Sequence, residues 1–102
     1  MSCIIRSKLD IKSMISILRI KMSSIQWRMG DSDNRYYGFY VLGHARNGIK
    51  IKIIKEDEPG KYYLGIYFYG TDPHFSPEEQ NKATAVLQRR IMRAIAAKKC
   101  SH

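Results

Sequence analysis

The sequence has few cysteines, few acidic residues and none of the spacings that mark metal sites. Its 102 residues include two cysteines, Cys3 and Cys100, close to opposite ends, and three scattered histidines. This distribution fits neither a disulfide framework nor the paired ligands of a zinc site. We therefore expect reduced thiols, no bound metal and no cofactor.

Motifs of the common enzyme classes are also missing. The sequence lacks a glycine-rich dinucleotide loop, a Walker loop and a nucleophile elbow. The residues left for an active site are His44, His74 and the pair Asp31 and Asp33, which come without an identifiable nucleophile or an oriented base. We expect a protein that is not an enzyme and that has no small-molecule substrate.

Long hydrophobic runs are absent too. The most apolar stretch, residues 14–29, is interrupted by basic residues, so it is neither a membrane span nor a secretory signal. We expect no membrane partner and a cytoplasmic location. Residues 1–24 are rich in Ser, Ile, Lys and Arg and contain a single acid, so a mitochondrial presequence is the alternative.

Positive charge is abundant and lies mainly at the two ends of the chain. Eighteen Lys and Arg residues stand against nine Asp and Glu residues, a formal net charge of +9. Residues 1–28 carry six basic groups and one acid, and residues 82–102 carry six basic groups and no acid. With 44% hydrophobic residues the chain should fold. A small, folded and strongly basic protein suggests a polyanionic partner.

Apolar residues that alternate with polar ones predict a set of short strands. The pattern covers 18–22, resumes over 25–29 and recurs in 35–43, 49–55 and 61–70. Asn47-Gly48 and Pro59-Gly60 predict the turns that join the last three segments. Residues 8–18 partly fit a helical stripe, so we expect a short helix there.

The C-terminal helix has the clearest local signals. Residues 76–79, Ser-Pro-Glu-Glu, place a hydroxyl at the N-cap, proline at the first helical position and glutamate at the third. Apolar residues then recur every three or four positions to about residue 97. We expect this helix to lay its apolar stripe on the sheet.

These segments predict an α+β fold with an antiparallel meander sheet, packed on one face by the C-terminal helix. The sheet should have four strands, or three if 25–29 is not a separate strand. Residues 1–23 are predicted to form a basic extension, helical or partly disordered, and 24–99 a single domain. The connections are short, as antiparallel neighbours require.

Turn lengths predict which residues face each other. A three-residue loop at 46–48 opposes Val41 to Ile53. The Pro-Gly connection opposes Ile53 to Ile66 if it is two residues long, and to Leu64 if it is four. Either alternative gives one apolar face, which Phe39 should join.

The second face of the predicted sheet carries tyrosines with lysines between them. Its members are Tyr36, Tyr40, Tyr63, Tyr67, Tyr69, Lys50 and Lys52, with Leu42 and His44 also turned outward. Bases stack on aromatic rings and ammonium groups pair with phosphates, so this face fits nucleic acid. Gly65 should leave a recess for a flat base. Alternatively, the N-terminal helix or a second subunit covers the tyrosines, or they are ordinary residues of an exposed strand.

The predicted nucleic-acid contacts therefore come from the sheet and the last helix. They are Tyr40, Lys50, Lys52, Tyr63, Tyr67, Tyr69, Lys82, Arg89, Arg90 and Arg93. The acid-free stretch after Glu79 should attract phosphates.

The run Phe75-Ser76-Pro77-Glu78-Glu79-Gln80 and the meander before it, within 24–97, resemble transcriptional coactivators of the positive cofactor 4 type. Dimers of that family bind single-stranded DNA on a curved sheet. If 8–18 is helical and 25–29 is not a separate strand, the order of elements instead resembles double-stranded-RNA-binding or signal-recognition-particle Alu-type domains. Neither family's binding loop is present in a clear version, so the resemblance is one of topology.

We expect a non-enzymatic protein that binds single-stranded DNA or RNA, driven by the backbone charge and helped by tyrosine stacking. The alternative is a protein-binding inhibitor or adaptor, such as a phage-type or toxin-neutralising protein, that acts on a nucleic-acid-handling target. A protein partner or a homodimer is compatible with both.

Overall fold

The computed structural model describes residues 1–32, 38–69 and 76–100, without the side chains of residues 31, 32, 38 and 47. Two helices and a short 3-10 turn accompany the strands: α1 (Ile11–Lys21), α2 (Pro77–Ala94) and Arg46–Gly48. The strands are β1 (Ser2–Arg6), β2 (Gln26–Ser32), β3 (Gly38–Ala45), β4 (Ile49–Lys55), β5 (Lys61–Phe68) and β6 (Lys98–Lys99). The α+β class is confirmed.

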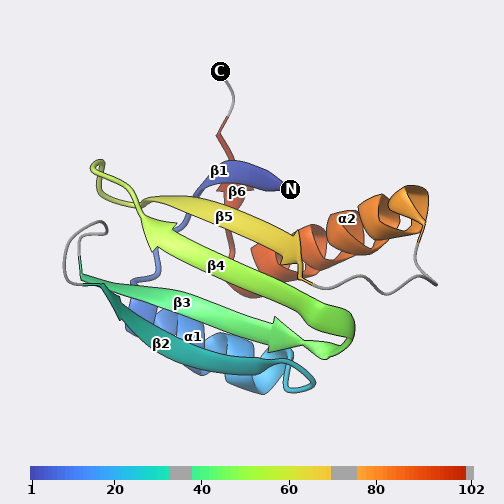
Figure 1. The fold of residues 1–102 in the computed structure, drawn as a ribbon. Coiled ribbons are helices and arrows are strands. Elements are labelled where there is room, and N and C mark those ends of the chain that lie inside the picture. The colour runs from blue at the N-terminus through green and yellow to red at the C-terminus, as the bar shows by residue number, and fades with distance from the viewer. Residues whose placement is uncertain (33–37, 70–75, 101–102) are drawn as a thin grey trace.

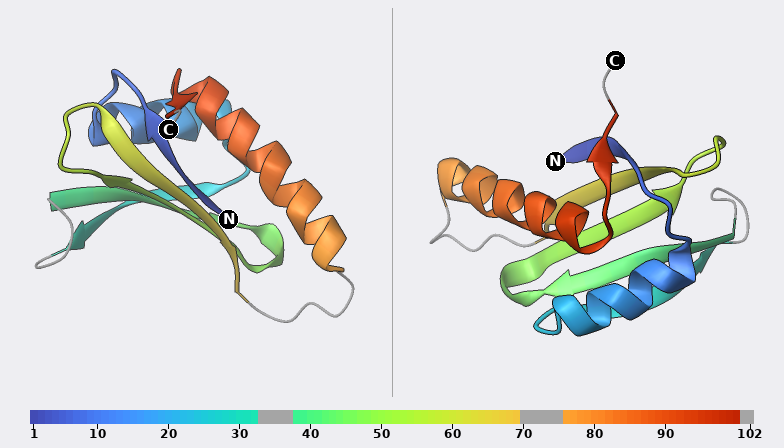
Figure 2. Two further views of the ribbon diagram at one scale, coloured as in Figure 1. Left: turned by 90° about the horizontal axis from the view of Figure 1, so that it is seen from above. Right: turned by 180° about the vertical axis from the view of Figure 1, so that it is seen from behind.

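The strands form one antiparallel sheet in the order β2-β3-β4-β5-β1-β6. Both helices pack on the same side of it, α1 over β2 and β3 and α2 beside β5 (Figure 1 and Figure 2). We call this side the covered face and the other the open face. The prediction of four strands is corrected to six, because β1 pairs with β5 and β6 pairs with β1.

The first 22 residues contribute to the same sheet and core. The predicted helix over 8–18 forms three residues later, at Ile11–Lys21, where the Asp10 carboxylate accepts a hydrogen bond of 2.8 Å from the Ser13 amide. The predicted strand over 18–22 is wrong, since these residues end α1. Met14 and Leu18 are fully buried, and a four-residue spacing places both against the sheet. Burial of this helical stripe in the core therefore outweighs the local alternation of apolar and polar residues, which favours a strand.

Helix α2 begins as predicted and ends earlier. The Ser76 hydroxyl accepts a hydrogen bond of 3.1 Å from the Glu79 amide, with Pro77 in the first turn. The helix ends at Ala94 instead of residue 97, since Ala96 has a positive φ of 51° that reverses the chain. The reversal brings the backbone of Cys100 to Ile4, where its amide donates a hydrogen bond of 3.0 Å.

The predicted pairing of the hairpins is confirmed. Val41 faces Ile53, as the three-residue loop requires. Ile53 faces Leu64, so the four-residue alternative holds at the Pro-Gly turn. Ile53, Leu64 and Ile66 lie on the covered face with at most 1% exposure.

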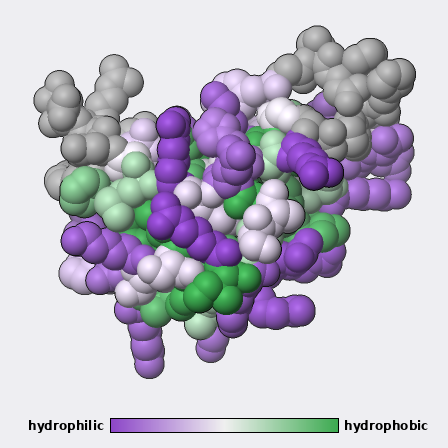
Figure 3. All heavy atoms as spheres, turned by 90° about the horizontal axis from the view of Figure 1, so that it is seen from below, coloured by the Kyte–Doolittle hydropathy of each residue, from purple (hydrophilic) through white to green (hydrophobic). Residues whose placement is uncertain are grey.

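Phe39 is not a core residue, contrary to the prediction. It is 48% exposed, lies at the beginning of β3 and is not part of the buried cluster. Ile20 on α1 and Met29 on β2 are also exposed, at 79% and 36%. Figure 3, a view onto the α1 and β2 side, shows hydrophobic side chains at this surface among hydrophilic ones. Tyr36 and the beginning of the predicted strand at 35 lie outside the described residues.

In the described parts of the chain, no helix combines the length and the apolar character needed to cross a membrane.

Candidate nucleic-acid interface

The open face is formed by alternate residues of five neighbouring strands. From β5 it takes Lys61, Tyr63, Gly65 and Tyr67, since side chains two apart share a face. Register then places Lys52 beside Gly65 and Lys50 beside Tyr67 on β4. Both helices lie on the other side (Figure 2). Neither helix therefore shields these side chains.

A cluster of three tyrosines follows β5 along this face. The Tyr63 and Tyr67 hydroxyls are hydrogen-bonded to each other. The Tyr67 and Tyr69 rings meet edge to face, with centroids 6.4 Å apart at an angle of 68°. Lys50 Nζ lies 4.4 Å from the centre of the Tyr69 ring, a cation–π contact. The structure thus brings four of the predicted site residues into direct contact.

Tyr69 is the most accessible ring of this cluster. It is 51% exposed, whereas Tyr63 and Tyr67 are half-buried. Exposed aromatic surface is what a nucleobase requires for stacking. Tyr69, which directly follows β5, is therefore the strongest candidate for a stacking platform among the three tyrosines.

The predicted recess at Gly65 is filled. A Cβ atom on Gly65 would lie 2.6 Å from the Tyr67 ring, so that ring already occupies the space above the glycine. Gly30 and Tyr40, which face each other on β2 and β3, repeat this arrangement. In both cases an aromatic ring covers a glycine, which packs the ring against backbone. Gly65 therefore offers no recess for a flat base.

Apolar side chains lie low on the open face. Leu42 and Ile54 belong to it by register but are only 7% and 9% exposed. Leu42 faces Lys52, and Ile54 faces Tyr63. Lysine and tyrosine carry long apolar bodies with polar ends, so they shield such neighbours while the polar ends reach water. The face is therefore a packed surface with a charged and aromatic outer layer.

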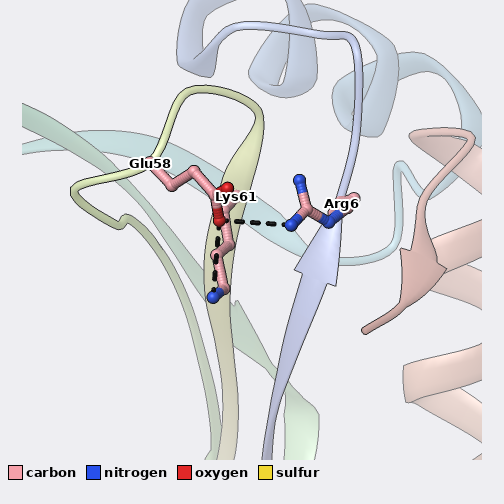
Figure 4. Close-up of polar contacts among 3 residues, drawn as sticks. All are labelled: Arg6, Glu58 and Lys61. Carbon is pink, nitrogen blue, oxygen red and sulfur yellow. Dashed lines mark hydrogen bonds and ion pairs between the residues drawn. The ribbon is translucent and has the colours of Figure 1, made fainter. Parts of the chain in front are cut away.

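A group of three cations at one end of the open face was missed by the sequence reasoning. Lys61, Arg6 and Lys98 face one another across β5, β1 and β6. Glu58 binds two of them, with its Oε2 3.1 Å from Arg6 and 3.6 Å from Lys61 (Figure 4). One carboxylate leaves a net positive charge. This group depends on the pairing of residues 2–6 with 61–65, which no local pattern signals.

The basic residues of α2 lie apart from the tyrosines. Lys82, Arg89, Arg90 and Arg93 are exposed on a helix that belongs to the covered side (Figure 2). The ten predicted contacts therefore divide into a sheet group and a helix group, on opposite sides of the sheet. The sheet group holds the aromatic rings.

The described residues offer little for other chemistry. They contain no group of three His, Cys, Asp or Glu side chains that could hold a metal ion. Cys3 and Cys100 are free thiols, as predicted. His74 and Asp33, weighed as catalytic candidates, lie outside the described residues.

Comparison with known proteins does not assign the chain. No family model matches it, and no curated protein matches its sequence. The topology also departs from both resemblances noted for the sequence. β1 precedes α1 and joins the sheet beside β5, so the order is neither a meander followed by one helix nor helix, three strands, helix.

Proposed function

We propose that the protein binds single-stranded nucleic acid, DNA or RNA, through the open face of the sheet and without sequence preference. One observation carries the proposal: an exposed tyrosine and its neighbouring lysine form a contact pair on a sheet face that neither helix covers. The strand positions of that face contribute cations and no carboxylate in the described residues.

The cations of this face supply a backbone-binding field. They are Arg6, Arg28, Lys50, Lys52, Lys61 and Lys98. Each lysine or arginine that neutralises a phosphate releases a bound counterion, so affinity should fall steeply with salt. A single strand that contacts three or four of them should give a slope of about −2 to −3 in a plot of log K against log salt.

The tyrosines supply the second contribution. Stacking of one base on an aromatic ring is worth about 1 to 3 kcal/mol. Lys50 occupies one side of the Tyr69 ring, and its ammonium group can pair with the phosphate of a base that stacks on the other side. This arrangement recognises a base by its flat surface, which every base has, and so carries no sequence preference.

The test is fluorescence anisotropy with a labelled single-stranded oligonucleotide, DNA and RNA in parallel, at about 50 to 200 mM salt. We expect Tyr69→Ala to weaken binding by about 5- to 150-fold, the value of one stacked base. Lys50→Gln should weaken binding. It should also make the slope of log K against log salt less steep, by the amount that one phosphate contact contributes. Lys12→Gln is the matched control, because Lys12 is exposed on α1 and its loss changes the net charge equally.

Two results would refute the proposal. One is binding that does not respond to salt. The other is an equal loss for Lys50→Gln and Lys12→Gln, which would mean that net charge alone attracts the oligonucleotide and that the open face is not the site.

A further inference from the structure

A groove with an apolar floor lies on the covered side, between α2 and the ends of neighbouring strands. Figure 2 (right) shows that α2 diverges from α1 on this side of the sheet. The volume of the groove is about 460 Å³. One wall is a stripe of α2, and the other is formed by the connections between α1 and β2 and between β3 and β4. The lining residues are Ser24, Ile25, Ala45, Arg46, Ile49, Lys82, Ala83, Val86, Leu87 and Arg90.

Apolar side chains line the floor and one wall of the groove. Ile25 and Ile49 are 6% and 8% exposed and lie at the base. Val86 on α2 is 45% exposed, although it belongs to a helix whose other large apolar residues pack against the sheet. Exposed valine beside buried isoleucines forms a site that an aliphatic side chain can fill.

The rim of the groove is positively charged. Arg46, Lys82 and Arg90 are exposed, and the lining contains no carboxylate. Both ion pairs found in the described residues involve Glu58, which lies elsewhere, so none of these three cations has a carboxylate partner there. The groove therefore presents, around an apolar centre, three cations that form no ion pair with a carboxylate of the described residues.

The spacing on α2 adds geometry to this chemistry. Lys82, Val86 and Arg90 are four residues apart, so they form a cation–apolar–cation stripe along two turns of the helix wall. A second helix that carries acidic, apolar and acidic residues at the same spacing would match this stripe.

We propose that this groove docks an acidic amphipathic helix of a protein partner. The helix would place an aliphatic side chain over Val86, Ile25 and Ile49, and its carboxylates would meet Arg46, Lys82 and Arg90. Helices commonly bind in grooves through apolar anchors at three- and four-residue intervals. The lining contains no aromatic residue on which a base could stack, which favours a peptide over nucleic acid at this site. The proposal does not rest on nucleic-acid binding by the open face.

The test uses a synthetic peptide of about 16 residues whose leucines form one helical stripe flanked by glutamates. An isomer with the same composition and no stripe is the peptide control. Binding is followed by anisotropy of the labelled peptide, and the site by backbone amide shifts of the uniformly labelled protein. We expect shifts at Ile25, Ile49 and Leu87 with the striped peptide.

A pair of neighbouring arginines provides the matched variants. Arg90 lines the groove, whereas Arg89 is equally exposed on the same helix and does not. We expect Arg90→Glu to weaken peptide binding by about 10-fold or more and Arg89→Glu by less than about 2-fold. Val86→Ser should weaken binding by about 5-fold without any change in charge. Circular dichroism confirms that each variant is folded.

Three results would overturn the proposal. They are an equal loss of peptide affinity for Arg89→Glu and Arg90→Glu, equal binding of the striped peptide and its isomer, and amide shifts that lie away from the groove. Absence of binding at about 1 mM peptide would do the same. The outcome is separable from that of the open face, because Val86→Ser should leave oligonucleotide binding unchanged and Tyr69→Ala should leave peptide binding unchanged.

Discussion

The covered and open faces of the sheet are built from alternate residues of the same strands. On β4, Ile51 and Ile53 are fully buried on the covered face, while Lys50 and Lys52, which alternate with them, point to the open face and are half-exposed. On β5, Leu64 and Ile66 alternate with tyrosines in the same way. The strand period of two assigns one face to the core and leaves the other with charged and aromatic side chains.

This division explains why the open face can carry a strong positive field. Like charges on neighbouring strands destabilise a sheet, although the effect between exposed groups is small and screened by salt. The covered face removes several large aliphatic side chains from water, each worth about 1.5 to 3 kcal/mol. The stability that comes from one face thus permits repulsion on the other.

The largest contrast is expected between two neighbouring residues of β4. Ile53→Ala removes a fully buried side chain and should lower the free energy of unfolding by about 2 to 5 kcal/mol. Lys52→Ala should lower it by about 1 kcal/mol or less, because Lys52 faces the open side and loses only its packing over Leu42. Urea unfolding measures both. Similar losses would mean that the open face is also part of the core.

Two glycines beneath aromatic rings offer the second contrast. A Cβ at Gly43 would lie 2.6 Å from the buried Trp27 ring, and one at Gly65 would lie 2.6 Å from the Tyr67 ring. Gly43→Ala should destabilise by about 1 to 3 kcal/mol, because the surrounding core resists movement of the indole. Gly65→Ala should cost less, since the tyrosine can swing toward solvent. If thermal unfolding shows equal costs, the Tyr67 ring is held as firmly as the Trp27 ring.

Two tyrosines on opposite faces provide a third comparison. Tyr62 is 4% exposed and donates a hydrogen bond of 2.7 Å to the Leu9 carbonyl. Tyr62→Phe should cost about 0.5 to 1.5 kcal/mol and leave oligonucleotide binding intact. Tyr69→Phe should change neither the free energy of unfolding nor oligonucleotide binding, because it keeps the aromatic ring that stacks on a base. A loss of binding with Tyr69→Phe would show that its hydroxyl is the recognised group.

The smallest effect is expected at alkaline pH. Burial, and then the charge of Asp10, raise the pKa of Tyr62 above its ordinary value of about 10. The folded state therefore holds this proton more tightly than the unfolded state, and stability is lost as pH rises from about 10 through the raised pKa. Tyr62→Phe should flatten this decline in unfolding experiments at increasing pH. An unchanged decline in Tyr62→Phe would contradict this assignment.

Local signals predicted some elements well. The cap at Ser76 and the Asn-Gly turn act within a few residues, so the start of α2 and the register of β3 and β4 followed from them. The Pro-Gly turn left two registers of β4 and β5 open, and the structure selects the one that places Ile53 opposite Leu64. The strand predicted around Leu18 is wrong. The alternation of apolar residues there fits a strand, the four-residue spacing fits a helix, and only packing against the sheet decides between them. The prediction of an open recess at Gly65 is wrong for a similar reason, because the direction of the Tyr67 ring depends on its neighbours in the folded sheet.

By itself, the sequence determined the α+β class, the alternation that separates apolar from charged and aromatic side chains, and the excess of positive charge. These are properties of composition and of periods within single elements. The tertiary structure decided that β1 joins β5, that Arg6, Lys61 and Lys98 gather at one end, and that the helical cations lie across the sheet from the tyrosines. Such juxtapositions join residues far apart in the chain, and they arise because burial of the whole apolar face selects one arrangement of the elements.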